Sequence, residues 1–317
     1  MATYNETLRQ RVLQLLDSGE ITQAAFAKKI GYTPAAVSQY KNGKYEAKST
    51  DNIEQAIAEF FEREQAREEI KSAALAYGRR DNYIPISTSE MAYKQMRLAQ
   101  LKRELTVIYG DTGVGKTKAA YCFVDDHPTN TVYVMSAPSS RSLRSTLKMI
   151  ARELRLPICQ TADLAVNIKE KLQREEKTLI IDEAQNLTVS VVDEISRWVD
   201  PDQATGEGRM AIVLIGNDGI LEKFNGDKDR RRDQNNGRLY KPLELRTNFT
   251  TMDDIRKLFP ALADQDMKKE LEFLLAVARG VTGVRAAVKI YNSAVDAGKI
   301  DYDTLYSFAA RKQAITI

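Results

Sequence analysis

One run of eight residues constrains the fold of this chain more than any other feature. Residues Gly110 to Thr117 read G-D-T-G-V-G-K-T, which matches the phosphate-binding pattern G-x-x-x-x-G-K-[ST]. The residues before it, 105–109, form a short apolar run, and the residues after it favour a helix. A strand, a glycine-rich loop and a helix in this order are the setting that the motif requires. The sequence therefore predicts a phosphate-binding loop inside an α/β domain.

The spacing of this loop has a physical reason. Glycines allow successive backbone N–H groups to turn inward and hold the β- and γ-phosphates of a nucleotide at the positive end of a helix. The lysine adds a positive charge, and the last hydroxyl can ligate Mg²⁺. We therefore expect ATP and Mg²⁺ as cofactors; a glycine-rich turn that matches by chance is the alternative. The expected nucleotide-binding residues are Gly110, Asp111, Thr112, Gly113, Val114, Gly115, Lys116 and Thr117.

Composition limits the remaining possibilities. The chain has 317 residues, 29% charged and 43% hydrophobic, as in an ordinary soluble protein with two or three domains. Because no apolar run has the length of a membrane span and the amino end has no signal pattern, we expect a cytoplasmic protein without a membrane partner. Two cysteines and one histidine cannot supply a zinc cluster. The net charge of +3 is too small to identify a partner.

Hydrophobic periodicity divides the chain into four parts. We expect an all-α helix-turn-helix domain at 1–65, a linker at 66–88, an α/β core at 89–250 and a helical lid domain at 251–317. Helical stretches separate the strand-like runs of the core, so we expect a parallel five-stranded sheet. These runs are 105–109, 131–136, 178–182, 210–216 and 240–245, and amphipathic helical runs follow at 267–279, 283–297 and 303–313.

The amino-terminal part has the pattern of a helix-turn-helix module. Gly31 permits the sharp turn, Thr33 caps the second helix and Pro34 occupies its first turn. The residues expected to face inward are Ala25, Phe26, Ile30, Val37 and Tyr40. The residues left facing out, as in a recognition helix that enters a DNA groove, are Ala35, Ser38, Gln39, Lys41 and Asn42. A small helical packing module with solvated lysines is the alternative.

A pair of acids follows a buried strand of the core. Asp182 at the end of Leu179-Ile-Ile would enter the Mg²⁺ shell, and Glu183 would orient or deprotonate the attacking water. The strand that ends at Ile215 is followed by Asn217, whose amide would lie beside the same water. A solvated acid pair and an ordinary turn at 217–219 are the alternatives.

These residues resemble the AAA+ ATPases over about 89–300. The resemblance implies that Asn217 is the sensor-1 residue and that Gly283-Val-Arg285 is the sensor-2 arrangement, with Arg285 as its arginine. It also implies that an arginine from a neighbouring subunit completes the site. Arg238 lies just before the last strand-like run, which is where the family has this arginine. The family often has a Ser-Arg pair there, and this chain has Gly-Arg instead. The rivals for this role are Arg230, Arg231, Arg232 and Arg246.

The segment from Ser139 to Leu156 predicts a helix with one basic face. Leucine and isoleucine recur at helical spacing at 143, 147, 150 and 154. Such a face could follow a DNA backbone, or it could be an ordinary solvated helix face. Because the chain also has the amino-terminal module, we favour binding to double-stranded DNA. A second basic run at 228–233 could serve DNA, a neighbouring subunit or neither. The cations expected to contact DNA are Arg141, Arg144, Lys148, Arg152 and Arg155.

The order of these parts is similar to the MuB family of phage transposition ATPases over essentially the whole chain. The residues that carry the resemblance are 110–117, 180–187, 215–217, 283–285 and the 25–42 module. The resemblance implies ATP-dependent, sequence-tolerant binding to target DNA as a helical homo-oligomer. It also implies a transposase partner that stimulates hydrolysis and so takes the filament apart. A helicase loader, a secretion or pilus ATPase and an ATP-switched transcriptional regulator are the alternatives.

Overall fold

The computed structural model describes residues 4–19, 21–45, 50–77, 82–200, 210–225 and 238–311. The chain divides into two compact units. The smaller unit comprises Met1–Gly78 and Val295–Lys299, and the larger one comprises Arg79–Ala294 and Ile300–Ile317. Each unit is described by itself below.

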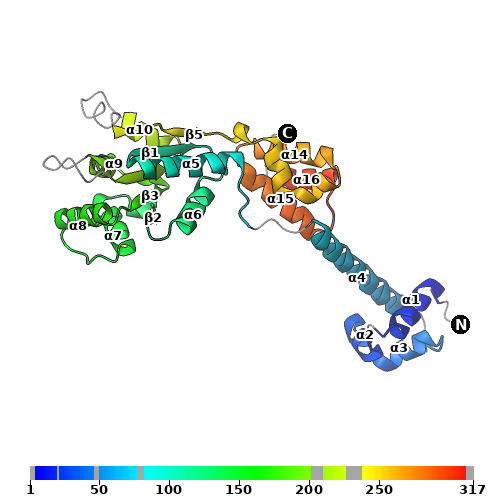
Figure 1. Ribbon diagram of the computed structural model, residues 1–317. Helices are drawn as coiled ribbons and strands as arrows, with labels where there is room; N and C mark the ends of the chain where they lie inside the picture. The colour runs from blue at the N-terminus through cyan, green and yellow to red at the C-terminus, as the bar shows by residue number, and fades with distance from the viewer. Residues whose placement is uncertain are drawn as a thin grey trace. The chain divides into compact units, whose positions relative to one another are not determined.

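The smaller unit is built from helices (Figure 1). Their bounds are α1 Glu6–Asp17, α2 Gln23–Ile30, α3 Pro34–Lys41 and α4 Asp51–Tyr77. The hydroxyls of Thr22 and Thr33 accept hydrogen bonds from the N–H groups of Ala25 and Ala36, which fixes where α2 and α3 begin. Gly31 ends α2 in the left-handed region, at φ +78°. Two short helices joined by a sharp turn confirm the expected helical amino-terminal region.

Two details of this unit differ from the prediction. The side chain of Ala25 is exposed, and Ala27 is buried instead. Because Thr22 caps α2, the helical phase turns Phe26, Ala27 and Ile30 inward together. In addition, α4 continues to Tyr77, so the first part of the expected linker is helical.

The larger unit contains a five-stranded parallel sheet in the order β2-β3-β4-β1-β5 (Figure 1). The strands are short and mostly buried because β-branched and leucine side chains alternate toward both faces. The sequence prediction of a parallel five-stranded sheet is therefore confirmed. The bounds are β1 Leu105–Gly110, β2 Thr131–Met135, β3 Thr178–Asp182, β4 Ala211–Ile215 and β5 Leu243–Leu245.

Helices cover both faces of the sheet (Figure 1). On one face, Leu179 and Ile181 of β3 pack with residues of α7, α8, α9 and α10. On the other face, Ile180 packs with residues of α5 and α6. The bounds are α5 Ser87–Lys102, α6 Lys116–Asp126, α7 Leu143–Glu153, α8 Thr161–Arg174, α9 Val189–Ser196 and α10 Gly219–Asn225.

The carboxyl-terminal helices belong to the same compact unit as the sheet, except for the end of α15 from Val295 onward. The buried carboxylate of Asp254 explains part of this association. It accepts hydrogen bonds from the N–H (2.7 Å) and hydroxyl (2.8 Å) of Ser87 and from the N–H (2.9 Å) of Thr251. These bonds join the start of α5 to the start of α12. The helices are α12 Met252–Leu258, α13 Pro260–Asp264, α14 Lys268–Ala278, α15 Val284–Asp296 and α16 Tyr302–Arg311.

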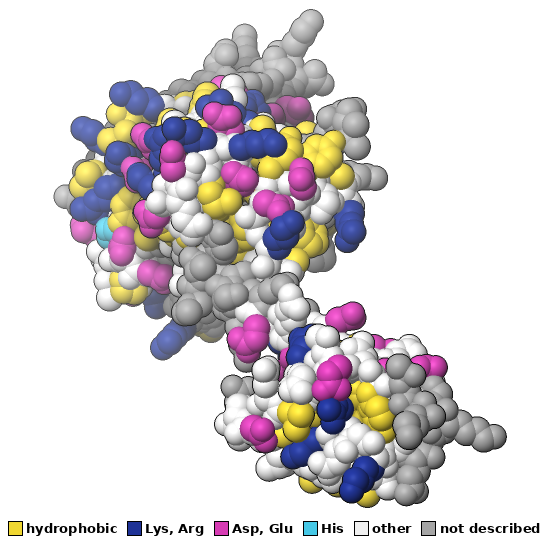
Figure 2. All heavy atoms as spheres, turned by 90° about the vertical axis from the view of Figure 1, so that its right-hand side faces the viewer, with side chains coloured by type: hydrophobic (Ala, Val, Ile, Leu, Met, Phe, Trp, Pro, Cys, Tyr) yellow, Lys and Arg dark blue, Asp and Glu magenta, His cyan; other side chains and the backbone are white. Residues whose placement is uncertain are grey.

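The surface carries charges of both signs. On the face drawn in Figure 2, Lys and Arg side chains of the larger unit lie among Asp and Glu side chains. This mixture agrees with the small net charge of the chain. Within the described ranges, no helix has both the length and the apolar composition that crossing a bilayer requires.

Candidate active site

The glycine-rich loop lies between the end of β1 and the start of α6. Gly110, Gly113 and Gly115 have φ values of +123°, +75° and +94°, which favour glycine. A Cβ atom on Gly110 would lie 2.0 Å from the carbonyl oxygen of Leu245, and one on Gly113 would lie 2.1 Å from that of Thr282. These two positions therefore need glycine for space as well as for conformation.

The loop amides are arranged to receive an anion. The hydroxyl of Thr88 in α5 donates to the carbonyl of Val114 at 2.7 Å and holds the middle of the loop. Among the described residues, no acceptor takes the backbone N–H groups of Gly113, Gly115 or Lys116. Free N–H groups at the amino end of a helix form a binding site for phosphate. The donor set thus fits the phosphates of a nucleotide.

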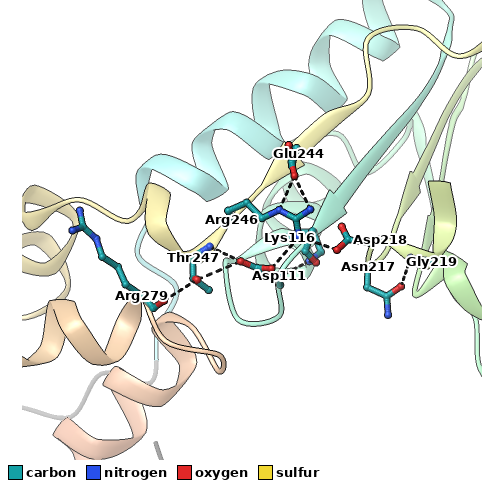
Figure 3. Close-up of polar contacts among 10 residues, drawn as sticks. Asp111, Lys116, Asn217, Asp218, Gly219, Glu244, Arg246, Thr247 and Arg279 are labelled. Carbon is teal, nitrogen blue, oxygen red and sulfur yellow. Dashed lines mark hydrogen bonds and ion pairs between the residues drawn. The ribbon is translucent and has the colours of Figure 1, made fainter. Parts of the chain in front are cut away.

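Lys116 points back across the loop (Figure 3). Its ammonium group donates to the carbonyl oxygens of Gly110 at 2.9 Å and Asp111 at 2.6 Å. Burial lowers the pKa of Lys116, while the nearby carboxylates of Asp182 and Glu183 raise it. The ammonium group of Lys116 is therefore held by the loop and interacts with the charges of the two acids that the sequence singled out.

Asp182 is 2% exposed at the end of β3. Its Oδ1 accepts from the N–H of Glu183 at 2.8 Å, and its Oδ2 accepts from the hydroxyl of Tyr133 at 3.0 Å. Burial, and then the charge of Asp182, raises the pKa of the Tyr133 phenol, so the hydroxyl stays protonated and donates. Sequence reasoning missed Tyr133, because a tyrosine in a strand is typical of ordinary packing.

The two side chains expected to hold a divalent cation offer a hydroxyl, on Thr117, and a carboxylate, on Asp182. In the described part of the chain, no group of three or more His, Cys, Asp and Glu side chains could hold a metal. The hydroxyl of Thr117 and the carboxylate of Asp182 suit Mg²⁺, which usually binds through one or two carboxylates together with substrate phosphates and water.

Glu183 is exposed and has a left-handed backbone at φ +53°. Its Oε2 accepts from Nε2 of Gln185 at 2.5 Å, and Oε1 of Gln185 accepts from the N–H of Asn217 at 3.3 Å. Gln185 thus bridges Glu183 and the end of β4. The sequence analysis includes Gln185 only within the run 180–187, and the available signal was a side-chain amide two residues after Glu183.

Asn217 follows β4, which lies between β3 and β1, so it lies between the two acids and the phosphate loop. Its side-chain oxygen accepts from the N–H of Gly219 at 3.0 Å, as Figure 3 shows. The ordinary turn that the sequence left open is therefore present at 217–219. The side chain is exposed at this edge of the sheet.

Arg246, directly after β5, is surrounded by carboxylates (Figure 3). It donates to Asp111 at 3.1 Å, to Asp218 at 2.9 Å and to Glu244 at 2.7 Å. The N–H of Thr247 also donates to Asp111 at 2.8 Å. The side chain of Asp111, expected to serve the nucleotide, is therefore held by Arg246 and Thr247. Its backbone is engaged within the chain as well, because its N–H donates to the carbonyl of Leu245 at 2.9 Å and its carbonyl accepts from Lys116.

Arg238, the arginine expected to reach a neighbouring subunit, is held within its own chain. Its Nε and Nη2 atoms both donate to the carboxylate of Asp200 at 2.7 Å. The rivals at 230–232 and the whole basic run at 228–233 lie outside the described residues.

Arg285 lies in the first turn of α15 and its side chain is exposed. The turn before it packs on the phosphate loop, since a Cβ atom on Gly283 would lie 2.7 Å from the carbonyl oxygen of Thr112. No other described residue forms a hydrogen bond or ion pair with the Arg285 guanidinium. Residues 283–285, the expected sensor-2 segment, are therefore close to the loop.

The expected basic helix is shorter than the sequence predicted. It begins at Leu143 because Ser142 caps it, and a 3₁₀ turn precedes it at 138–140. Leu147, Ile150 and Leu154 are buried as predicted. No carboxylate in the described ranges pairs with the five cations, of which Lys148 is half-buried and Arg141, Arg144, Arg152 and Arg155 are exposed.

The recognition-helix candidates are less accessible. Ser38, Gln39 and Lys41 are half-buried, and the carbonyl of Lys41 accepts from Arg9 at 3.1 Å. Val37 and Tyr40 are buried, as the sequence predicted. The outer face of α3 is therefore only partly open.

Comparison with known proteins agrees with this geometry. Residues 100–224 match the family model described as an AAA domain. The DNA transposition protein B of the Mu-like prophage FluMu from Haemophilus influenzae is 32% identical over 224 residues, which cover 69% of this chain and 72% of that protein. The ATP-dependent target DNA activator B of Escherichia phage Mu is 25% identical over 280 residues, covering 86% of this chain and 82% of that protein.

Two solved structures share the fold of the core. The ORC2 protein of Aeropyrum pernix aligns with a TM-score of 0.54 at 18% identity, covering 75% of this chain and 71% of that one. The Cdc6p protein of Pyrobaculum aerophilum aligns with a TM-score of 0.51 at 17% identity, covering 69% and 65%. The AAA domain, the sheet order and the prophage relative together identify the chain as an AAA+ ATPase that belongs to the DNA transposition protein B family of Mu-like phages.

Proposed function

We propose that this protein binds ATP and Mg²⁺, assembles on target DNA with little sequence preference and presents that DNA to a transposase. One observation carries the proposal: the phosphate loop, Asp182, Glu183 and Asn217 lie at the same edge of the sheet, on the adjacent strands β1, β4 and β3. The names of the phage Mu and prophage relatives, a target DNA activator and a transposition protein, support the biological role.

In the proposed nucleotide complex, the loop amides and Lys116 hold the phosphates. Thr117 and Asp182 would hold Mg²⁺ through their oxygens. The cation would neutralise negative charge that develops on the phosphates.

Glu183 is the proposed general base, which accepts a proton from the attacking water. Gln185 orients the Glu183 carboxylate, and Asn217 is the amide beside the same water. Arg285 is the proposed cis arginine that contacts the phosphates from the start of α15. Its position is supported by the close packing of Gly283 on the loop.

We infer that a second subunit completes the site and that ATP-bound subunits form a helical filament. Arg238 is the proposed arginine that reaches the neighbouring site. To do so it has to leave Asp200, so assembly would compete with this ion pair. Hydrolysis, stimulated by the transposase, would then release the subunits from DNA.

The proposed DNA contact is the basic face of α7 and its flanks, made of Arg141, Arg144, Lys148, Arg152 and Arg155. Two hydrogen bonds connect this segment, and Ser136 just before it, to residues that follow Glu183. Asn186 donates to the carbonyl of Ser136 at 3.2 Å, and the N–H of Thr188 donates to the carbonyl of Arg141 at 3.3 Å. Both donors lie within five residues of Glu183. A movement of Glu183 on hydrolysis of the γ-phosphate would therefore also move the segment that carries Arg141.

The test is a charge reversal on this face, Arg144→Glu with Lys148→Glu. We expect ATP-dependent affinity for a random-sequence duplex, measured by fluorescence anisotropy, to fall at least tenfold, with a salt slope reduced by about two. The control is Lys268→Glu with Lys269→Glu on α14, which should bind as the wild type does. Unchanged binding by the α7 variant would contradict the proposal. A discrete footprint on one sequence would instead favour an operator-binding regulator.

A further inference from the structure

Tyr133 lies in the middle of β2, on the face of the sheet that α6 covers. Its neighbours Val132 and Val134 point to the opposite face and pack in the other core cluster. In the parallel register Tyr133 pairs with Ile180, and Met135 pairs with Asp182. Since side chains two residues apart share a face, Tyr133 and Asp182 lie on the same side of the sheet.

The phenol reaches the carboxylate directly. Its hydroxyl donates to Oδ2 of Asp182 at 3.0 Å, while the N–H of Glu183 donates to Oδ1 at 2.8 Å. Two donors, one on each oxygen, fix the rotation of the carboxylate. Each oxygen still has acceptor capacity for a further ligand.

The same phenol contacts the helix that carries the other expected metal ligand. The rings of Tyr121 and Tyr133 have centroids 5.2 Å apart. Tyr121 is four residues after Thr117 in α6, so both side chains lie on one face of that helix. Contacts therefore run from Tyr121 of α6 through Tyr133 to Asp182, and Thr117 lies on the same face of α6 as Tyr121.

We propose that Tyr133 is a positioning residue that orients the Asp182 carboxylate toward Mg²⁺. The inference deepens the proposed function and rests on it, because it takes Asp182 as the metal ligand. Hydrogen bonds to ligating carboxylates set their direction, and loss of such a bond typically weakens metal binding about 10- to 100-fold. Tyr133 is half-buried and Asp182 keeps its second donor, so we expect the lower end of that range.

The variant Tyr133→Phe removes the hydroxyl and keeps the ring packed on Tyr121. Binding of a fluorescent ATP analogue is titrated with Mg²⁺, and the same binding is measured in EDTA. We expect the Mg²⁺ concentration for half-maximal binding to rise about tenfold, while binding in EDTA and the urea midpoint of unfolding stay at the wild-type values. The control Tyr93→Phe removes a similar hydrogen bond, from Tyr93 to Asp126 at 2.7 Å, and should leave the Mg²⁺ requirement unchanged.

The variant Asp182→Asn separates the failure of this inference from failure of the proposed function. If Asp182→Asn leaves the Mg²⁺ requirement unchanged, Asp182 is not the ligand and the proposed metal site fails. If Asp182→Asn raises the requirement and Tyr133→Phe does not, Tyr133 only packs and the inference is overturned. In the double variant, Tyr133→Phe should add no further loss, because its effect passes through Asp182. Additive losses would indicate a structural role and would also overturn the inference.

Discussion

Replacement of Arg246 by alanine tests how the site is held together within one subunit. Arg246 contributes one positive charge among the carboxylates of Asp111, Asp218 and Glu244, so this cluster has a formal charge of −2. In Arg246→Ala the formal charge becomes −3, directly beside the loop that receives the phosphates. Asp111 keeps its bonds to Thr247, so the loop itself should remain folded.

The expected loss follows from Coulomb's law. If the charge and the phosphates are taken to be about 8 Å apart, an effective dielectric constant of about 20 to 40 gives an interaction of roughly 1–2 kcal/mol. Because the Arg246 side chain is 30% exposed, solvent screening favours the lower value. That range corresponds to ATP binding weaker by roughly 5- to 30-fold.

The assay is the dissociation constant of a fluorescent ATP analogue at low and high salt. We expect the loss in Arg246→Ala to shrink at high salt, since screening weakens interactions between partly exposed charges. Arg246→Lys, which keeps the charge but cannot bridge three carboxylates, should lose less. The control Arg256→Ala breaks an exposed ion pair with Asp253 and should bind as the wild type does.

A different outcome would refute this reasoning. If Arg246→Ala binds ATP normally, loses hydrolysis and regains it when mixed with Lys116→Ala subunits, then Arg246 acts on a neighbouring subunit. The role of Arg246 would then be in the neighbouring site, and its ion pairs with Asp111 and Asp218 would not explain the loss of activity.

Three further variants test other parts of the structure. Asp254→Asn should lower the free energy of unfolding by about 1–3 kcal/mol at pH 7, because it mismatches buried donors on Ser87 and Thr251. Burial raises the pKa of Asp254, but these hydrogen bonds outweigh it and lower the pKa, so its stabilisation is present above pH 3.8 and is lost as the pH falls through the lower folded value. Urea denaturation from pH 7 to pH 3 should therefore show a narrowing gap between wild type and variant, and a constant gap would contradict this account. Gln185→Leu should lower kcat at least tenfold with little change in KM, and a raised KM with unchanged kcat would show that Gln185 serves binding instead. Glu183→Gln should bind ATP and DNA, lack turnover and stay on DNA in a dissociation assay, whereas rapid hydrolysis by this variant would remove Glu183 from the role of base.

The sheet could be predicted from sequence because its strands carry strong local signals. The phosphate-loop motif marks the first strand, and four further apolar runs mark the others. Because helical stretches separate these runs, they predict a parallel sheet, and the structure confirms it. The ends of elements were harder to predict. The capping side chain of Ser142 moves the start of α7 to Leu143, and a cap depends on local geometry as well as on residue type.

The contacts between distant segments could not be predicted. Arg246 and Asp111 are 135 residues apart, and nothing in either segment specifies that they pair. Arg238 was placed by resemblance, while its contact with Asp200 depends on how two loops approach each other. Tyr133 and Gln185 became visible only when strand order and register brought them to the acids of β3.

Electron microscopy of the wild-type protein with random-sequence duplex DNA tests the central claim most directly. With ATP and Mg²⁺ we predict continuous helical filaments along the DNA, and with Lys116→Ala under the same conditions we predict bare DNA. Discrete rings or dimers at separate positions with ATP, or filaments that form equally well with Lys116→Ala, would contradict the claim that ATP controls assembly on DNA.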